Sequence, residues 1–113
     1  MKIENAPFTV VNWKTVTPTK HPGTEGVASW RTVNAGDVRL RIVEYSPGYI
    51  ADHWCPKGHV VFVLDGELVT ELKDGKRFVM KKGASYHVAE NRKNPHMSRT
   101  KKGAKLFIVD KAL

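Results

Sequence analysis

The stretch Gly48-Tyr-Ile-Ala-Asp-His-Trp-Cys-Pro-Lys-Gly-His59, with the apolar run at 60–64, decides how this chain is interpreted. It holds the only cysteine and two of the five histidines. Side chains alternate between the two faces of an extended strand, so residues at even separations share a face. His53, Cys55 and His59 are therefore expected to converge on one interior point. Imidazole and thiolate are transition-metal ligands, and the stretch predicts a metal site.

The size of the chain allows one domain. Its 113 residues can bury a core but leave no room for a second one. No apolar run approaches the roughly 20 residues that a membrane span needs, and the N-terminal residues lack the apolar region of a secretory signal. A single cysteine cannot form an internal disulfide, which fits a reducing compartment. These features predict a cytoplasmic protein without a membrane partner.

The net charge of +8 raises the question of an anionic partner. Basic pairs occur at Lys81-Lys82, Arg92-Lys93 and Lys101-Lys102. Nucleic-acid binding needs such pairs on one face, but these stand at apparent turns and strand ends, where lysine protects sheet edges and keeps the surface solvated. We expect no nucleic-acid partner. The alternative role for the charge is a basic mouth that attracts a small anionic molecule.

The chain reads as all-β. No segment has sustained helical periodicity, and short β-rich runs alternate with Gly, Pro, Asn and Asp. This pattern predicts an antiparallel sandwich or barrel in one domain, 1–113, with an N-terminal arm and loop at about 1–26 and a barrel at about 27–111. Besides the run at 60–64, the expected strands are 8–11, 27–33, 37–46, 67–73, 76–80, 84–89, 96–100 and 104–111.

Two dipeptides, Asp65-Gly66 and Asp74-Gly75, predict tight hairpins. The loop at 15–26 has no periodicity and is expected to cover one end of the core or to lie over a partner subunit. The run at 106–109 is apolar on both faces, so we expect it to be central or covered by another subunit.

Strand parity also suggests which residues line a pocket. Tyr45, Val61 and Val63 share parity with inward positions, and Tyr86 is placed at the mouth. The strand at 37–46 carries arginines on one face. If that face points inward, Arg41 also lines the pocket and binds a carboxylate or phosphate; otherwise it faces solvent or a subunit interface.

A metal site of this kind needs a further ligand from elsewhere in the chain. His96 follows Pro95 and enters a strand, where a ligand can be directed inward. His87 lies in mid-strand between Tyr86 and Val88 and is the alternative. We favour His96.

The spacing resembles the first cupin motif: Gly, a few residues, His-x-His, three or four residues, Glu, six residues, Gly. This chain has Gly48, then His53-x-Cys55, three residues, His59, six residues and Gly66. Cysteine thus replaces one histidine of the motif, and histidine replaces its glutamate. Four residues instead of the usual five separate the first glycine from the first histidine.

The second cupin motif is Gly, five residues, Pro-x-Gly, two residues, His. Gly83 matches its first glycine, whereas Ala89 replaces the proline and Asn91 the turn glycine. Strict counting puts Asn94 at the ligand position. A turn that is longer by two residues puts His96 there, and we prefer that alignment.

The sequence Asp52-His-Trp-Cys55 with Lys57-Gly-His59 resembles the DHCW-motif branch of small cupins in particular. The resemblance implies a single-domain cupin, an antiparallel β-sandwich or small jelly-roll barrel, and by family habit a homodimer. It does not fix a reaction, because cupins include enzymes, sensors and storage proteins.

The implied ligands are His53, Cys55, His59 and His96, three nitrogens and one sulfur. This set favours zinc, with iron, nickel or copper as alternatives. Two functions remain open: a metal-dependent enzyme acting on a small anionic molecule, and a non-catalytic module that binds or senses a small molecule with or without metal. A weaker third possibility is that Cys55 acts as a redox-responsive thiol.

Overall fold

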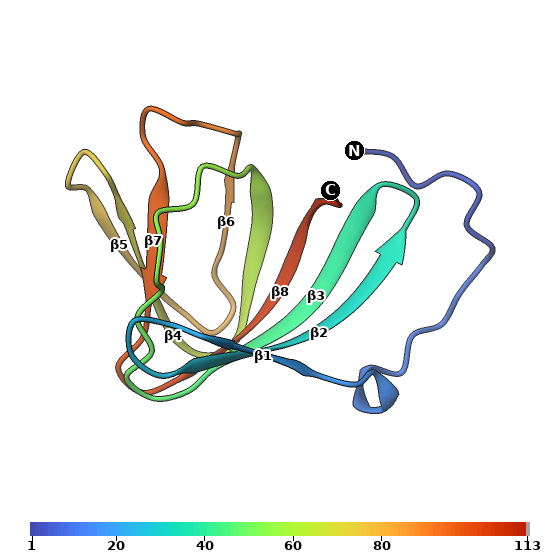
Figure 1. Cartoon of the computed structure of the whole chain (residues 1–113), viewed down its shortest axis with the longest axis horizontal. Helices are drawn as coiled ribbons and strands as arrows, with labels where there is room; N and C mark the ends of the chain where they lie inside the picture. Colours follow the sequence, from blue (N-terminus) through green and yellow to red (C-terminus); the bar gives the residue numbers. More distant parts are fainter. Residues whose placement is uncertain (113) are drawn as a thin grey trace.

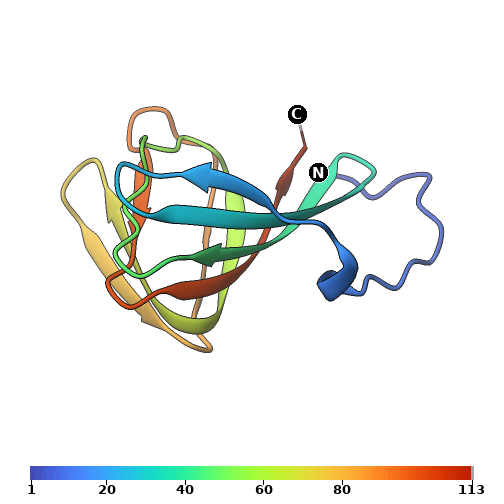
Figure 2. The ribbon, with the colours of Figure 1, turned by 60° about the horizontal axis from the view of Figure 1, so that its bottom comes forward.

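A computed structural model describes residues 1–112, which form an antiparallel β-barrel (Figures 1 and 2). The described elements are the 3-10 turn η1 (Trp13–Thr15) and the strands β1 (Thr19–Pro22), β2 (Val27–Ala35), β3 (Val38–Tyr45), β4 (His59–Leu72), β5 (Arg77–Lys81), β6 (Ser85–Val88), β7 (His96–Arg99) and β8 (Ala104–Lys111). The all-β class expected from the sequence is confirmed.

Strand β4 connects the two walls of the barrel. The strand order is β1-β2-β3-β8-β4-β5, and β6 and β7 also pair with β4. The first half of β4 pairs with β8 and β6, and its second half pairs with β5 and β7. A register shift between Val63 and Asp65 marks the point where β4 leaves one sheet for the other. Since β4 continues through Asp65-Gly66, the hairpin predicted there is wrong, whereas the turn at Asp74-Gly75 is present.

The core lies between these walls and follows from strand alternation. On β8, Leu106 and Ile108 point inward and are buried, and on β4 the inward residues Val61, Val63 and Leu68 are buried as well. Each such side chain stabilises the fold by about 1.5–3 kcal/mol. Strand β8 lies between β3 and β4, so the doubly apolar run at 106–109 occupies the expected central position.

The N-terminal region differs from expectation. Residues 8–11 form no strand, and the Phe8 side chain is 98% exposed. The loop expected at 15–26 contains β1, because Thr19–Pro22 pairs with the edge of β2. A short apolar or β-branched run becomes a strand only where a partner edge is free, and local sequence does not reveal that partner.

Both ends of the described chain meet at the turn between β2 and β3, as Figure 1 shows. The backbone N–H of Asp37 donates to the carbonyl of Lys2, and the N–H of Ala112 donates to the carbonyl of Asp37. The N-terminal amine is also 3.9 Å from the Asp37 carboxylate. Within residues 1–112, no helix is long and apolar enough to cross a membrane.

Candidate functional site

Two buried histidines face each other inside the barrel. His59 begins β4 and His96 begins β7, and their Nε2 atoms are 2.8 Å apart. The hydroxyl of Tyr86, on β6, is 3.2 Å from Nε2 of His59. Three strands thus bring two imidazoles and a phenol together, and one ring N–H donates to the other ring nitrogen.

Burial keeps His96 and Tyr86 uncharged at neutral pH. It lowers the pKa of His96 to about 4, with smaller contributions from the nearby His59 and His53. It also raises the pKa of the Tyr86 phenol well above its usual range. At pH 7 the His96 ring is therefore neutral and keeps a nitrogen lone pair, which metal binding requires, and Tyr86 keeps its proton.

A buried carboxylate that is hydrogen-bonded to two arginines lies on the other side of His59. Asp110, on β8, is fully buried and accepts hydrogen bonds from Arg39 Nε and NH2 at 2.7 and 2.8 Å and from Arg41 NH2 at 2.8 Å. Burial alone would raise the pKa of Asp110, but the hydrogen bonds from Arg39, the nearby His59 ring and the two arginine charges hold it well below its usual range. The arginine-bearing face of β3 therefore points inward.

Asp110 also orients His59. Its Oδ2 is 3.6 Å from His59 Nδ1, slightly beyond hydrogen-bond distance, and Nδ1 is buried without a closer partner. The nearby negative charge favours the proton on Nδ1. Nε2 is then left as an acceptor or a ligand, an arrangement that histidine ligands commonly share with a neighbouring carboxylate.

Cys55 lies directly opposite His96. Its backbone N–H donates to the His96 carbonyl at 2.6 Å, and the His96 N–H donates back to the Cys55 carbonyl at 2.9 Å. Directly opposed residues of an antiparallel pair project to the same face. The thiol and the His96 ring are therefore neighbours, and both line the same cavity.

The other candidate ligands lie elsewhere. The His53 side chain is 70% exposed and its Nδ1 is 2.6 Å from Asp52 Oδ1, although the residue still lines the edge of the cavity. His87 is exposed on β6. The Asn94 side chain bonds Asp74 at the turn between β4 and β5. Among residues 1–112, no group of three or more His, Cys, Asp or Glu side chains is arranged to hold a metal.

Two cavities adjoin at His96. The first, called here the cationic cavity, has a volume of about 180 Å³. The second, called the apolar cavity, has a volume of about 590 Å³ and lies between β5 and β6. The cationic cavity is lined by Trp30, Arg39, Arg41, Val43, Tyr45, Tyr49, Ala51, His53, Cys55, Lys57, His59, His96, Met97, Ser98, Ile108 and Asp110. The apolar cavity is lined by Thr70, Leu72, Arg77, Phe78, Val79, Met80, Ser85, Tyr86, His87, Val88 and His96.

The pocket residues named from the sequence are distributed between cavity and core. Tyr45 and Arg41 line the cationic cavity and Tyr86 lines the apolar one, whereas Val61 and Val63 belong to the buried core. Sequence reasoning missed Asp110, because a lone acidic residue near the end of an apolar strand gives no sign of its two arginine partners. The inward parity of position 110 with Leu106 and Ile108 was the one available signal.

Comparison with known proteins rests on structure alone, since no family model and no curated protein matches the sequence. A predicted oxalate decarboxylase from Thermotoga maritima superposes with a TM-score of 0.77 over 93% of this chain and 100% of that one, at 17% identity. An RmlC-like cupin from Shewanella frigidimarina gives 0.72 over 96% and 94%, at 15% identity. The chain has the cupin fold.

Another structural neighbour has a different name. Ectoine synthase from P. lautus superposes with a TM-score of 0.75 over 94% of this chain and 80% of that one, at 14% identity. Proteins with such different names share one barrel, so the likeness gives the fold of this chain and leaves any function to be argued from its own residues.

Proposed function

We propose that this cupin binds a divalent transition metal inside its barrel and uses the site to bind or transform a small anionic molecule. The single observation that carries the proposal is the buried pair His59 and His96, whose ring nitrogens point at each other beside Cys55. The motif Asp52-His-Trp-Cys55 supports placing the chain in the DHCW-motif branch.

The donor chemistry fits a metal, although only part of the ligand set is gathered. Two imidazoles and a neighbouring thiol favour zinc, with iron, nickel or copper as alternatives. His59 and His96 would hold the ion together with Cys55. His53 would complete the set after turning away from Asp52. A bound ion would supply Lewis-acid polarisation of a substrate oxygen.

The residues around this cluster have roles of their own. Asp110 keeps His59 in one orientation, and the neutral phenol of Tyr86 donates a hydrogen bond. Arg39, Arg41 and Lys57 supply more positive charge to the cationic cavity than Asp110 removes. That excess favours an anionic ligand.

A second candidate function is a metal-free binding or sensing module. The observation that favours it is again the contact between His59 and His96, because each imidazole already satisfies the other without an ion. Metal content decides between the two functions.

The decisive experiment is elemental analysis of untagged protein that is purified without added metal. Wild type is expected to carry close to one equivalent of a transition metal. His96→Ala and Cys55→Ala are expected to lose most of it, since each removes a proposed ligand. His87→Ala is the matched control, because the exposed His87 side chain lies outside the cluster.

The outcomes separate the candidates. A wild type without stoichiometric metal, also after incubation with zinc, rejects the metal site and leaves the metal-free module. Full metal content in His96→Ala together with loss in His87→Ala would show that the fourth ligand is assigned to the wrong histidine.

A further inference from the structure

Two adjoining cavities that differ in charge and in size surround the histidine cluster. His96 lines both of them, so its ring stands at their common wall. The cationic cavity is lined by Arg39, Arg41 and Lys57 against one carboxylate. The lining of the apolar cavity contains no acidic residue and a single arginine, Arg77, which is exposed. A ligand that reaches the cluster therefore meets three basic side chains on one side and a larger, less charged surface on the other.

Size limits what each cavity can hold. A cavity of about 150 Å³ in another protein accommodates benzene, so the cationic cavity, at about 180 Å³, has room for a small head group. The apolar cavity, at about 590 Å³, falls in the range of roughly 300–1,000 Å³ that is typical of small-molecule sites. The larger part of a ligand belongs in the apolar cavity.

The cationic cavity has unused capacity for an anion. Arg41 is only 5% exposed, its Nε has no hydrogen-bond partner, and its single side-chain hydrogen bond goes to Asp110. Its guanidinium lies 4.4 Å from the centre of the Trp30 ring, which holds it in place. Burial lowers the pKa of Arg41 even though Asp110 opposes that shift. A second negative group would offset the remaining cost of burying this charge.

The apolar cavity is open and unfilled at its rim. Phe78 and Val79 on β5 line this cavity and are 50% and 55% exposed, so apolar surface is accessible at its edge. Thr70, at 3% exposure, has a buried hydroxyl without a hydrogen-bond partner. Its proximity lowers the pKa of Tyr86 slightly against the larger effect of burial. Apolar walls with a few polar groups are typical of organic-ligand sites.

We infer that the ligand of this chain is an amphipathic organic carboxylate. Its carboxylate lies in the cationic cavity near Arg39, Arg41 and Lys57, and its apolar body lies in the apolar cavity against Phe78 and Met80. The part of the ligand between its carboxylate and its apolar body then lies next to His96. This inference rests on the proposed small-molecule function but does not require the metal.

The test uses three probes on the whole chain, with chelator-treated and zinc-loaded samples titrated separately by calorimetry and NMR. The probes are 4-phenylbutanoate, acetate as the head group alone, and 4-phenylbutan-1-ol as the uncharged analogue. We expect 4-phenylbutanoate to bind at least about tenfold more tightly than either of the others, because acetate lacks the apolar body that the cavity buries and the alcohol lacks the charge.

Two variants test the contributions of the two cavities separately. Lys57→Gln should weaken 4-phenylbutanoate about threefold and leave the alcohol unchanged, because a partly exposed charge contributes modestly. Lys93→Gln removes an exposed charge outside both cavities and serves as its control. Phe78→Ser should weaken 4-phenylbutanoate about tenfold and leave acetate unchanged. Since Phe78 is half exposed, this variant should keep its fold, which circular dichroism checks.

Equal affinity for the acid and the alcohol, or no effect of Phe78→Ser on 4-phenylbutanoate, overturns the inference. Its failure can be told apart from failure of the metal proposal. The expected pattern in chelator-treated protein supports the amphipathic ligand even if elemental analysis finds no metal. Stoichiometric metal without that pattern leaves the metal site standing and removes this ligand class.

Discussion

His96 resists protonation, and the metal-free protein should therefore be sensitive to mild acid. The pKa of His96 is lowered to about 4 from an ordinary value of 6.5. Between these values the unfolded chain binds a proton that the folded chain does not bind, so the free energy of unfolding falls as the pH falls. Across the window from about pH 6.5 to about pH 4 we expect a loss of about 3 kcal/mol.

The measurement is urea unfolding of chelator-treated protein at several pH values in that window. His96→Asn removes the titrating ring and should flatten the dependence, although its stability at pH 7 will be lower. His87→Asn, at an exposed position, should keep the wild-type slope. If His96→Asn retains the full slope, another group causes the acid sensitivity.

At the scale of single residues, the sequence predicts which residue types form the site better than it predicts where their side chains point. His59 and Cys55 line one cavity with His96, and their spacing suggested such a meeting. His53 turns outward to Asp52 because residues 50–58 form bends and an isolated bridge, not a regular strand, so parity does not hold there. The partners of Asp110 come from β3, about 70 residues away, and no local pattern encodes them.

Among the strands, the corner of β4 depends on Gly66. Its φ of +78° lies in the left-handed region, and an added Cβ would collide with the carbonyl oxygen of Gly103. Gly75 also has a positive φ, +98°, but nothing lies within 4 Å of an added Cβ. We expect Gly75→Ala to cost about 1–2 kcal/mol of unfolding free energy and Gly66→Ala to cost a further 1–3 kcal/mol or so.

Urea unfolding of both variants measures this difference directly, because the backbone conformation is similar and only the neighbouring atoms differ. Equal losses of unfolding free energy would mean that β4 and the start of β8 move apart around the added methyl group at little cost. A fall in the cooperativity of unfolding for Gly66→Ala alone would show that the two sheets separate when the corner is disturbed.

The same corner shows where prediction from sequence stops. Asp-Gly is a strong hairpin dipeptide, and at Asp74-Gly75 it makes one, because β5 follows at once and pairs back. At Asp65-Gly66 the partner strand is β8, whose residues come some 40 positions later, and the chain continues straight into the second sheet. Local turn chemistry is shared by both sites, and only the distant partner decides between a hairpin and a bulge.

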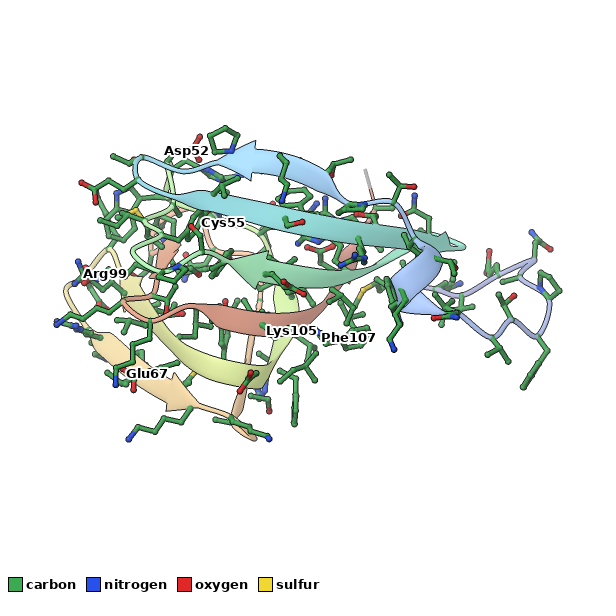
Figure 3. The ribbon with its side chains drawn as sticks, turned by 90° about the horizontal axis from the view of Figure 1, so that it is seen from below. Asp52, Cys55, Glu67, Arg99, Lys105 and Phe107 are labelled. Carbon is green, nitrogen blue, oxygen red and sulfur yellow. The ribbon has the colours of Figure 1, made fainter. Side chains whose placement is uncertain are left out.

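At the level of the whole molecule, we propose a homodimer that covers the outer face of the larger sheet. Phe62 on β4 is 40% exposed and pairs across the sheet with Phe107 on β8, which projects outward beside Lys105 in Figure 3. Val60 and Val109 form the next pair along the same face. Contiguous apolar surface of this kind commonly marks a protein interface.

Sedimentation of the wild type at micromolar concentration should give twice the monomer mass. Phe62→Lys should raise the dissociation constant at least about tenfold, equivalent to about 1.4 kcal/mol. Val79→Lys is the matched control, since Val79 is similarly exposed on β5 and outside this face. A wild type that stays monomeric at high concentration contradicts the proposal.

The meeting of both chain ends at Asp37 affects how this protein should be handled. Met1 lines a surface hollow with His59 and His87, and Asp110, two residues before Ala112, lies against His59. A polyhistidine affinity tag on either terminus would therefore emerge beside the histidine cluster. It would offer competing imidazoles and carry nickel from the purification resin to the place where metal content is to be measured. Tag-free preparation avoids that interference.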